Sequence, residues 1–289
     1  MTTFVSLQTP LHTAAALYDS TKRHDAQPHD IPEIFLDAMS VREEVYVDEQ
    51  SVPLSNEFDS EDAKSYHWVS YASIAASSPK LPATTSSLPN GTHTNGTSHD
   101  PPPEKARQGS ASKLAVGTIR LVPPPHAHDP AFAHNGGPDM SGCHLPLAEA
   151  EPKGCLRRGE EPYVKLGRLA VLKPYRKLGL SALLLNAALR YAAEHAEEVL
   201  PPLSPTEMEQ KRLQWEKEGK EGEVLDRWEG LVLVHAQTGV ERLWKSWGFV
   251  KDTTMGTWVE EGIEHVGMWR RVDVVRRRAS VVGALKGGM

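Results

Sequence analysis

The sequence predicts an α/β fold whose sheet is mostly antiparallel and contains one central parallel pair of strands, flanked by helices. Apolar blocks of strand length alternate with helical segments in the order β-α-β-β-β-α-β-α-β-β. A strand–turn–helix unit at 163–195 stands in the middle of this order. The long polar insertions fall between the blocks, where loops are tolerated, so we expect a single domain.

The first half of the chain supplies one helix and three strands. Residues 4–7 form a short strand, 67–73 alternates as a strand does, and 115–122 is another strand. The segment 31–50 is predicted to be a helix, because its apolar residues recur along one side. That side comprises Ile34, Phe35, Ala38, Met39, Arg42, Val45 and Tyr46.

The central unit begins with an apolar strand bounded by Pro162 and Pro174. The next apolar residues fall at the i, i+3, i+4, i+7, i+8 and i+11 positions of one helical face, so a long helix follows. The strand residues are Val164, Leu166, Leu169, Val171 and Leu172, and the helix residues are Leu180, Leu183, Leu184, Ala187, Ala188 and Tyr191.

The remaining predictions concern the end of the chain and the insertions in a domain spanning 1–289. A strand, a short helix and two strands follow at 231–235, 238–247, 249–254 and 265–272. Insertions interrupt the domain at about 77–113, 123–161 and 201–228, and a basic tail occupies 273–289. The first insertion is predicted to be a disordered loop that joins an antiparallel pair, and the third is predicted to be partly helical.

Composition limits the classes of partner. The 289 residues carry 32 Lys and Arg against 38 Asp and Glu, a net charge of −6, which argues against a nucleic-acid partner. No apolar run approaches the roughly 18 residues of a membrane span, and no signal peptide is evident, so we expect a cytoplasmic protein. The basic tail leaves a nuclear location open. Cys143 and Cys155 are too few for a disulfide scaffold and fit a reducing compartment.

The turn between the central strand and helix indicates an anion site. A helix N-terminus exposes backbone N–H groups that attract an anion. Arg176 and Lys177 add positive charge there, and Gly179 lets the backbone approach a phosphate closely. The sequence contains neither the GxxxxGK[ST] of a P-loop nor the GxGxxG of a dinucleotide-binding fold.

The same turn resembles the acyl-CoA signature of the GNAT superfamily of N-acetyltransferases, [QR]-x-x-G-x-[GA]. It stands here as Arg176-Lys177-Leu178-Gly179-Leu180-Ser181, in which Ser181 replaces the usual glycine or alanine but still offers its backbone N–H. The segment His235-Ala236-Gln237, followed by 243–249 with Trp244, is similar to the second CoA-contacting motif. This resemblance implies a mixed sheet with a splayed central parallel pair.

Two further segments are similar to the small GNAT branch that includes ElaA-like and YjcF-like members. The segment 258–268 resembles the ending E-x-G-I-x-H-x-x-M of that branch. The stretch 42–50 fits the same branch, as does the acidic run of Glu57, Asp59, Glu61 and Asp62 ahead of His67. Acetyl-CoA is therefore the expected co-substrate. The acceptor is expected to be a small-molecule primary amine, such as an amino-sugar phosphate or a polyamine, that attacks directly.

The resemblance also assigns roles to residues. It implies that backbone groups of Leu169, Ala170 and Val171 hold the pantetheine arm and the thioester oxygen, and that 176–181, Gln237 and Trp244 complete the cofactor site. A base must remove a proton from the amine, and His235 is the first candidate, with His265 and Glu260 or Glu261 as second choices. Each of these side chains could instead have a purely structural role. The histidines could be hydrogen-bonded core residues, and the glutamates could belong to a solvent-exposed turn.

One departure concerns the leaving group. The family commonly has a tyrosine at the position of Trp244, where it protonates the departing thiolate, and an indole N–H is not a usable acid. Either the thiolate, with an ordinary pKa of about 8.5, leaves unassisted, or another group such as Tyr175 or Tyr191 serves.

Several alternatives stay open. The acidic residues Glu49, Glu57, Asp59 and Asp62 either line an acceptor pocket or form a solvated loop. Two other functions stay open: a protein lysine or N-terminal acetyltransferase, and a catalytically weak acyl-CoA-binding regulatory protein. The oligomeric state also stays open, because the open sheet could pair with a second subunit in a homodimer. No metal is predicted, because the spacing of His126, His128, His134, Cys143 and His144 matches no zinc pattern.

Overall fold

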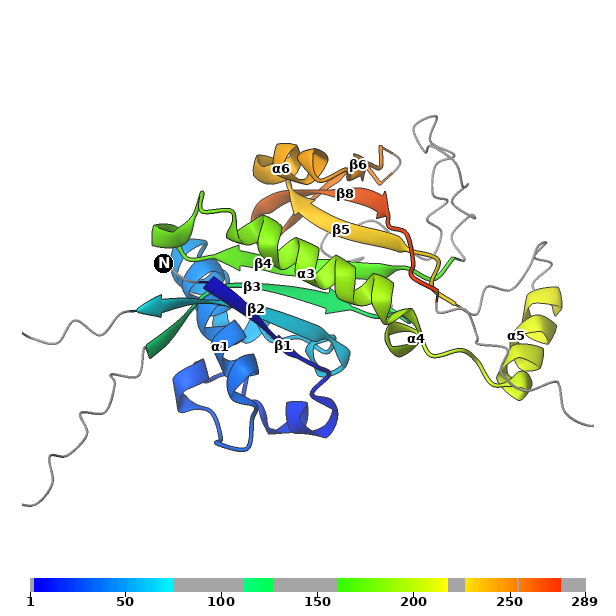
Figure 1. Ribbon diagram of the computed structural model, residues 1–289, viewed down its shortest axis with the longest axis horizontal. Helices are drawn as coiled ribbons and strands as arrows, with labels where there is room; N and C mark the ends of the chain where they lie inside the picture. Colours follow the sequence, from blue (N-terminus) through cyan, green and yellow to red (C-terminus); the bar gives the residue numbers. More distant parts are fainter. Residues whose placement is uncertain (1–2, 75–111, 127–160, 218–226, 254, 277–289) are drawn as a thin grey trace, which may run out of the picture.

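A computed structural model of the chain describes residues 3–74, 112–126, 161–217, 227–253 and 255–276. In these residues one sheet has the strand order β1-β2-β3-β4-β5-β8-β6 (Figure 1). The strand β7 pairs with β8 beside this order. The strands are β1 Thr3–Gln8, β2 Tyr66–Ile74, β3 Ser112–Val122, β4 Val164–Val171, β5 Leu231–Gln237, β6 Val250–Lys251, β7 Thr257–Glu260 and β8 Ile263–Arg271. The α-helices are α1 Glu33–Arg42, α3 Leu180–Glu194, α4 Ala196–Val199, α5 Pro205–Lys217 and α6 Glu241–Ser246.

The centre of the sheet is the parallel pair β4 and β5, and the other strand pairs are antiparallel. The predicted fold class is therefore confirmed. The β4–β5 pairing runs from Val164 opposite Val232 to Leu166 opposite Val234 and then stops. Both strands continue past this point, so their carboxyl ends lie apart and leave strand edges facing one another.

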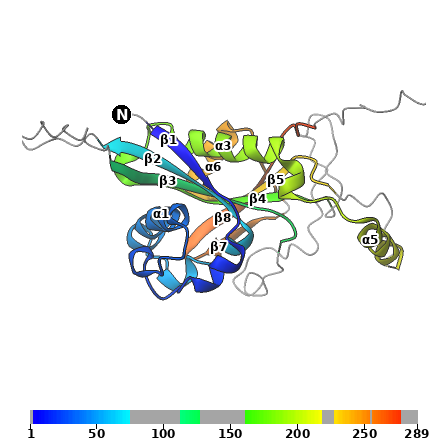
Figure 2. The same cartoon turned by 60° about the horizontal axis from the view of Figure 1, so that its bottom comes forward.

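Helices cover both faces of the sheet (Figure 2). On one face α3 buries Leu184 and Leu185 against Val164 and Val232. On the other face α1 and the chain after it pack Ala38 and Val45 against β2, β3 and β4. Phe35 and Met39 of the predicted apolar side belong instead to a cluster with Leu11, Tyr18 and Ile31. Burial against the sheet explains the spacing of the predicted α3 face at Leu180, Leu184 and Ala188, but Leu183 on the same predicted face is exposed.

The predicted helix 31–50 is divided into two kinds of helix. The α-helical part α1 begins after Pro32 and ends at Arg42, and the chain continues as a π-helix, η3 (Glu43–Glu49). A π-helix accommodates wider turns and occurs often at functional sites. Along the predicted apolar side, Phe35, Ala38, Met39, Arg42 and Val45 are all buried.

Most strand predictions are confirmed with shifted ends, and one strand was missed. The strand β3 begins at Ser112 rather than at 115, and β6 is reduced to two residues. The missed strand β7 forms a hairpin with β8 through Glu261 and Gly262, which both have positive φ, of 52° and 77°. Its four residues carry too little alternation to be distinguished from a loop in the sequence.

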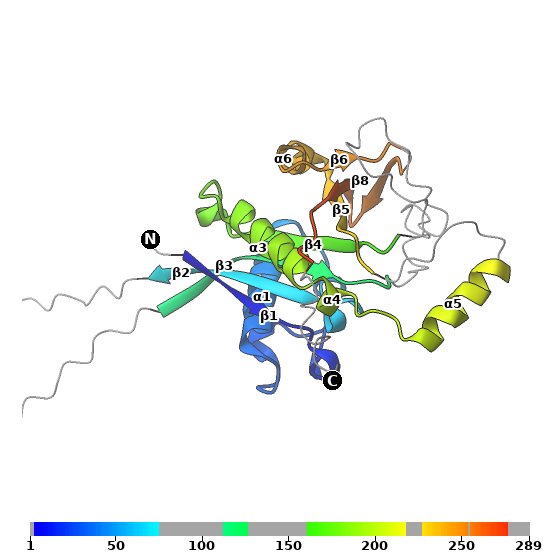
Figure 3. The ribbon, with the colours of Figure 1, turned by 45° about the vertical axis from the view of Figure 1, so that its right-hand side comes forward.

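The insertions are described only in part. The helix α5 confirms the helical content predicted for 201–228, and it lies away from the sheet (Figure 3). Most of the predicted insertions 77–113 and 123–161, both cysteines and the tail beyond residue 276 lie outside the described residues. None of the helices in the described ranges has the length and apolar content needed to span a bilayer.

Candidate functional site

A cavity of about 1330 Å³ opens where β4 and β5 diverge. Its wall includes η3, β4 and β5, the start of α3, α6 and the β7–β8 hairpin. Every site residue predicted from the sequence lines this cavity except Leu178, whose side chain is 59% exposed. The lining set comprises Leu169, Ala170, Val171, Arg176, Lys177, Gly179, Leu180, Ser181, His235, Gln237, Trp244, Glu260 and His265.

The N-terminus of α3 is open to this cavity. Gly179 is the N-cap with a φ of +80°, and this cap makes no side-chain hydrogen bond to the first turn. A Cβ built on Gly179 meets no atom within 4 Å, so the backbone there is accessible to a bound group. Four N–H groups begin any α-helix without partners inside the helix. This end of the 15-residue helix α3 therefore offers an anion site.

Arg176 was expected to add positive charge at the anion site, but in the structure it is paired with a carboxylate. Its guanidinium binds Glu49 through two hydrogen bonds of 2.7 and 2.5 Å, and its Nε donates to the Val171 carbonyl at 2.9 Å. The Arg176 hydrogen bond lowers the pKa of the Glu49 carboxyl, so the pair is ionised near neutral pH. The positive charge expected beside a phosphate is thus paired with a carboxylate on η3.

The strand β4 contains a bulge beside the cavity. The β3–β4 register shifts between Thr118 and Arg120, and Arg168 has a φ of +51°. Immediately after it, the Leu169 carbonyl accepts a hydrogen bond of 3.1 Å from the Tyr46 hydroxyl of η3. The two β4 carbonyls at Leu169 and Val171, both beyond the end of the β4–β5 pairing, therefore each receive a side-chain donor. The contact of Tyr46 was missed, since the sequence identified this residue only as part of an apolar helix face.

The candidate bases lie on β5, β7 and β8. His235 packs edge-to-face against Trp258 at 4.9 Å, and burial, with Lys165 and His265 nearby, lowers its pKa well below the ordinary value. His235 is therefore neutral near pH 7 but is a weaker base than an unperturbed histidine. The Nδ1 of His265 lies 2.8 Å from the Ile263 carbonyl, which assigns the proton to Nδ1 and leaves Nε2 as the free acceptor. Glu260 lines the same cavity from β7.

Lys165 of β4 also lines the cavity. Burial lowers the pKa of its ammonium, and the charge of Glu260 opposes that shift. A lysine, two histidines and a glutamate therefore share the cavity wall near the expected acceptor end.

Two hydrogen bonds connect η3 and the residues after it to the opposite wall. Gln237 at the end of β5 donates to the Gln50 side chain at 3.0 Å, and Asn56 donates to Glu261 of the β7–β8 turn at 2.9 Å. Both bonds join segments on either side of the cavity. The first bond holds the predicted cofactor residue Gln237 against the segment that also carries Tyr46 and Glu49.

The aromatic residues considered for leaving-group protonation lie in different places. Trp244 is buried and packs edge-to-face against Trp247 at 5.3 Å and Phe249 at 5.0 Å. Tyr175 lines the cavity, whereas the Tyr191 hydroxyl is hydrogen-bonded to Glu198 outside the lining. Of the two tyrosines considered from the sequence, only Tyr175 is placed where it could meet a thiolate.

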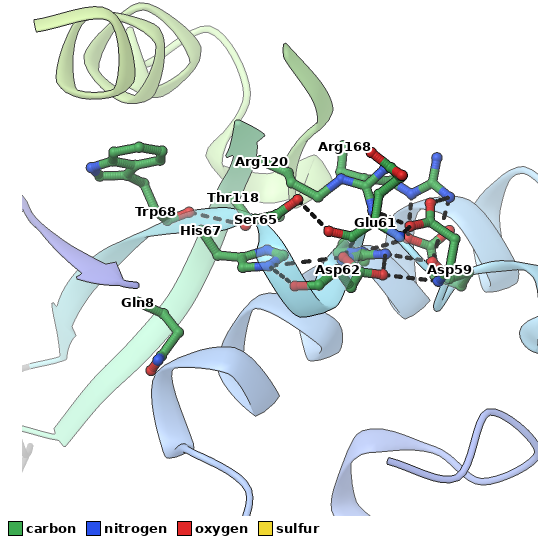
Figure 4. A network of polar contacts seen from close by, with 12 residues as sticks. Gln8, Asp59, Glu61, Asp62, Ser65, His67, Trp68, Thr118, Arg120 and Arg168 are labelled. Carbon is green, nitrogen blue, oxygen red and sulfur yellow. Dashed lines mark hydrogen bonds and ion pairs between the residues drawn. The ribbon is translucent and has the colours of Figure 1, made fainter. Parts of the chain in front are cut away.

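Of the acidic residues for which an acceptor pocket and a solvated loop stayed open, Glu49, Glu57 and Asp59 line the cavity, and each is paired with an arginine. Asp59 pairs with Arg120 at 2.7 Å and with Arg168 at 3.2 Å, and Asp62 pairs with Arg120 at 2.8 Å (Figure 4). Burial would raise the pKa of Asp62, but the charges of Arg42 and Arg120 lower it well below its ordinary value. Glu57 pairs with Arg42 and Arg168, as Glu49 pairs with Arg176.

Of the histidines considered for metal binding, only His126 belongs to the described residues. It stacks on Tyr163 at 4.3 Å and contacts the Tyr163 carbonyl at 2.9 Å, while His128, His134, Cys143 and His144 lie outside the described ranges. Within those ranges no group of three His, Cys, Asp or Glu side chains is arranged to hold a metal ion.

No protein-family model and no curated protein matches the sequence. Solved structures similar to the chain include an acyl-CoA N-acyltransferase from Pseudomonas aeruginosa, with 17% identity, a TM-score of 0.40 and coverage of 93% of this chain and 99% of that chain. Escherichia coli ElaA has 15% identity, a TM-score of 0.39 and coverage of 93% and 100%. Arabidopsis thaliana NAA60 with a bisubstrate analogue has 10% identity, a TM-score of 0.37 and coverage of 93% and 100%.

Proposed function

We propose that the protein is an N-acyltransferase that transfers the acetyl group of acetyl-CoA to the primary amine of a small molecule. One observation carries the proposal: the diverging ends of β4 and β5 and the open N-terminus of α3 meet in a single cavity. The diverging strands offer edges to an extended chain that bears amides, and the helix N-terminus offers N–H groups to a pyrophosphate. Pantetheine and pyrophosphate are adjacent parts of CoA.

The reaction needs a neutral amine, a polarised carbonyl and a departing thiolate. The amine nitrogen bonds to the thioester carbon, the carbon–sulfur bond breaks, and the sulfur keeps the electron pair. Backbone N–H groups within 169–171 are suited to polarise the carbonyl oxygen, and one such donor contributes roughly 3 kcal/mol to catalysis. Since an alkylammonium has a pKa of about 10.4, a base must also accept a proton.

His235 is the first candidate for this base, because it lies on β5 immediately after the β4–β5 pairing ends. Its lowered pKa keeps the imidazole unprotonated at neutral pH, which is the form that accepts a proton, although burial also makes it a weaker base. His265 and Glu260 line the same cavity and are the next acceptors along a proton path toward its acceptor side.

The proposal is tested by isothermal titration calorimetry of the protein with acetyl-CoA, ATP and NAD. We expect micromolar binding of acetyl-CoA and no comparable binding of ATP or NAD. An absence of acetyl-CoA binding would overturn the proposal. A thiol-release assay with amino-sugar phosphates, polyamines and lysine-containing peptides then separates a small-molecule acceptor from a protein acceptor.

A second candidate function is that of a catalytically weak acyl-CoA-binding regulatory protein. Trp244 favours it, because an indole enclosed by Trp247 and Phe249 supplies no acid for the thiolate. The substitution Trp244→Tyr distinguishes the two candidates, with Trp247→Tyr as the matched control outside the cavity lining. If Trp244→Tyr alone has a higher turnover than the wild-type protein, the result supports a regulatory protein. If both variants have the turnover of the wild-type protein, the result argues against it.

A further inference from the structure

We propose that Tyr46 is a positioning residue of the acyl-CoA site, whose hydroxyl holds the Leu169 carbonyl in the direction in which it receives an amide N–H of the pantetheine arm. The inference rests on the proposed function, because it assumes that acetyl-CoA lies between the diverging strands. It adds a side chain from η3 to a site that the sequence motifs place on β4, β5 and α3.

The first step concerns the unpaired edge of β4. Leu172 donates its N–H to Val116 of β3 at 2.9 Å. Because backbone groups of successive residues in a strand point to alternate edges, the groups of Val171 face away from β3. The carbonyl of Val171 accepts from Arg176 Nε, and the carbonyl of Leu169 accepts from Tyr46. Two side chains thus occupy positions that a neighbouring strand would otherwise fill.

The second step distinguishes these two donors. Arg176 is partly exposed and is bound by Glu49, so its bond to Val171 is one of several that the flexible guanidinium can make. Tyr46 is half-buried in the cavity wall, and its hydroxyl donates one hydrogen bond, to the Leu169 carbonyl. Burial, together with the charge of Glu57, raises the pKa of the Tyr46 phenol. The hydroxyl therefore keeps its proton at every working pH and acts as a donor, not as a base.

The third step concerns what the Leu169 carbonyl can still accept. A carbonyl oxygen has two lone pairs and can accept two hydrogen bonds. The phenol of Tyr46 can therefore keep its bond while an incoming amide N–H takes the second lone pair. A carbonyl held by a fixed donor loses less freedom when the ligand binds, which lowers the entropic cost of binding.

Both ends of the Tyr46–Leu169 hydrogen bond are anchored to the same carboxylate. Arg42, which ends α1 one turn before Tyr46, binds Glu57 at 2.6 Å. Arg168, which precedes Leu169 in the bulge, lies 3.2 Å from the same oxygen of Glu57. The helical segment and the strand that form the bond are thus fixed to one another through Glu57, which limits how far the hydroxyl and the carbonyl can move apart.

The substitution Tyr46→Phe tests the inference, because it removes the hydroxyl and keeps the ring. Tyr66→Phe is the matched control, since the Tyr66 hydroxyl donates to the Glu198 carbonyl at the same distance of 3.1 Å but does not line the cavity. Both variants and the wild-type protein are titrated with acetyl-CoA and with adenosine 3′,5′-bisphosphate, which carries no pantetheine arm.

We expect Tyr46→Phe to weaken acetyl-CoA binding about threefold to tenfold, to raise the KM for acetyl-CoA with little change in kcat, and to leave the bisphosphate unaffected. Tyr66→Phe should change neither affinity. Equal acetyl-CoA affinity in Tyr46→Phe and wild type, or equal weakening of both ligands, would overturn the inference. If the wild-type protein fails to bind acetyl-CoA, it is the proposed function that fails.

Discussion

Arg42 at the end of α1 and Arg168 in the bulge of β4 bind the same oxygen of Glu57. Their Nε atoms lie 2.6 and 3.2 Å from Glu57 Oε1. The carboxylate is 2% exposed, so this contact joins helix and strand inside the protein. Arg168 is the residue of the bulge that has a positive φ. Its side chain is fixed by Glu57, and the same carboxylate neutralises the buried guanidinium of Arg42.

The contact belongs to a closed arginine–carboxylate ring in which every charge touches two opposite charges. Three arginines alternate with three carboxylates, so the ring is neutral as a whole. Burial of charge is costly unless each ion is paired, and here each one is paired twice. The order around the ring is Arg42, Glu57, Arg168, Asp59, Arg120, Asp62 and again Arg42.

Removal of one carboxylate from this ring should therefore be costly. We expect Glu57→Gln to lower the free energy of unfolding by about 3 kcal/mol, because Arg42 and Arg168 both lose a partner while Arg42 stays buried. Urea unfolding at pH 7 measures the change. Glu209→Gln, which breaks an exposed pair with Arg212 on α5, is the control and should leave the midpoint unchanged. Equal midpoints for Glu57→Gln and wild type would contradict the structural role of the ring.

The sequence predicts the fold better than it predicts the charges. The helix and strand positions follow from apolar spacing, because burial against the sheet imposes a period of about 3.6 on α3. In β2, residues 66–72 are buried on both faces, and alternate side chains enter two different clusters. The π-helical end of the 31–50 segment could not be predicted in the same way. A π-helix and an α-helix differ in hydrogen bonding, and both bury a similar apolar stripe over two turns.

In the candidate site too, the position of the backbone could be predicted and the pairing of the charges could not. The motif 176–181 and residues 235–237 identified one cavity, because a strand–turn–helix order fixes where a helix N-terminus lies. The partners of Glu49, Glu57 and Asp59 could not be read from an acidic run. Their neutralisation depends on Arg120, Arg168 and Arg176, which come from distant parts of the chain and meet these carboxylates only after β3 and β4 pair.

Glu49 competes with acetyl-CoA for Arg176 if the motif turn binds the pyrophosphate. We expect Glu49→Gln to tighten acetyl-CoA binding about twofold to fivefold, since an ion pair that is more than a third exposed contributes at most about 1 kcal/mol. Calorimetric Kd values at constant ionic strength measure the effect. Tighter binding is the opposite of what loss of an ordinary binding residue would cause.

Asp48→Asn is the control for this prediction, because it removes the same negative charge from the same π-helix. Asp48 pairs with Arg23 and does not line the cavity. A general effect of net charge would therefore appear in both variants. The prediction is contradicted if Glu49→Gln and Asp48→Asn change the affinity equally or if Glu49→Gln weakens binding.

Buried histidines should make stability fall in mild acid. Burial lowers the pKa of His67 to about 4, although Asp62 opposes the shift, whereas an unfolded histidine titrates near 6.5. Between these values the unfolded state binds a proton that the native state does not, so stability decreases as pH falls from 6.5 toward 4. The contribution of His67 is about 1.4 kcal/mol per pH unit.

The variant His67→Gln isolates this contribution. Its stability at pH 7 need not equal that of the wild type, so the measured quantity is the slope of unfolding free energy against pH. We expect that slope to become shallower between pH 6.5 and 5, while His126 and His235, whose pKa values are also lowered by burial, still contribute. Identical slopes in the two proteins would show that His67 does not remain neutral in the folded state.

Gly179 provides the most direct test of the helix N-terminus as an anion site. A tryptophan at this position would occupy the open space beside the first turn of α3, where no atom lies within 4 Å of the added Cβ. We expect Gly179→Trp to abolish acetyl-CoA binding in a protein with native circular dichroism. Gly256→Trp is the matched control, because Gly256 also has a positive φ, of 67°, and equally open surroundings but does not line the cavity. Both variants carry a similar backbone strain, so a loss of affinity confined to Gly179→Trp must come from the blocked backbone N–H groups, whereas unchanged affinity would place the CoA phosphates elsewhere.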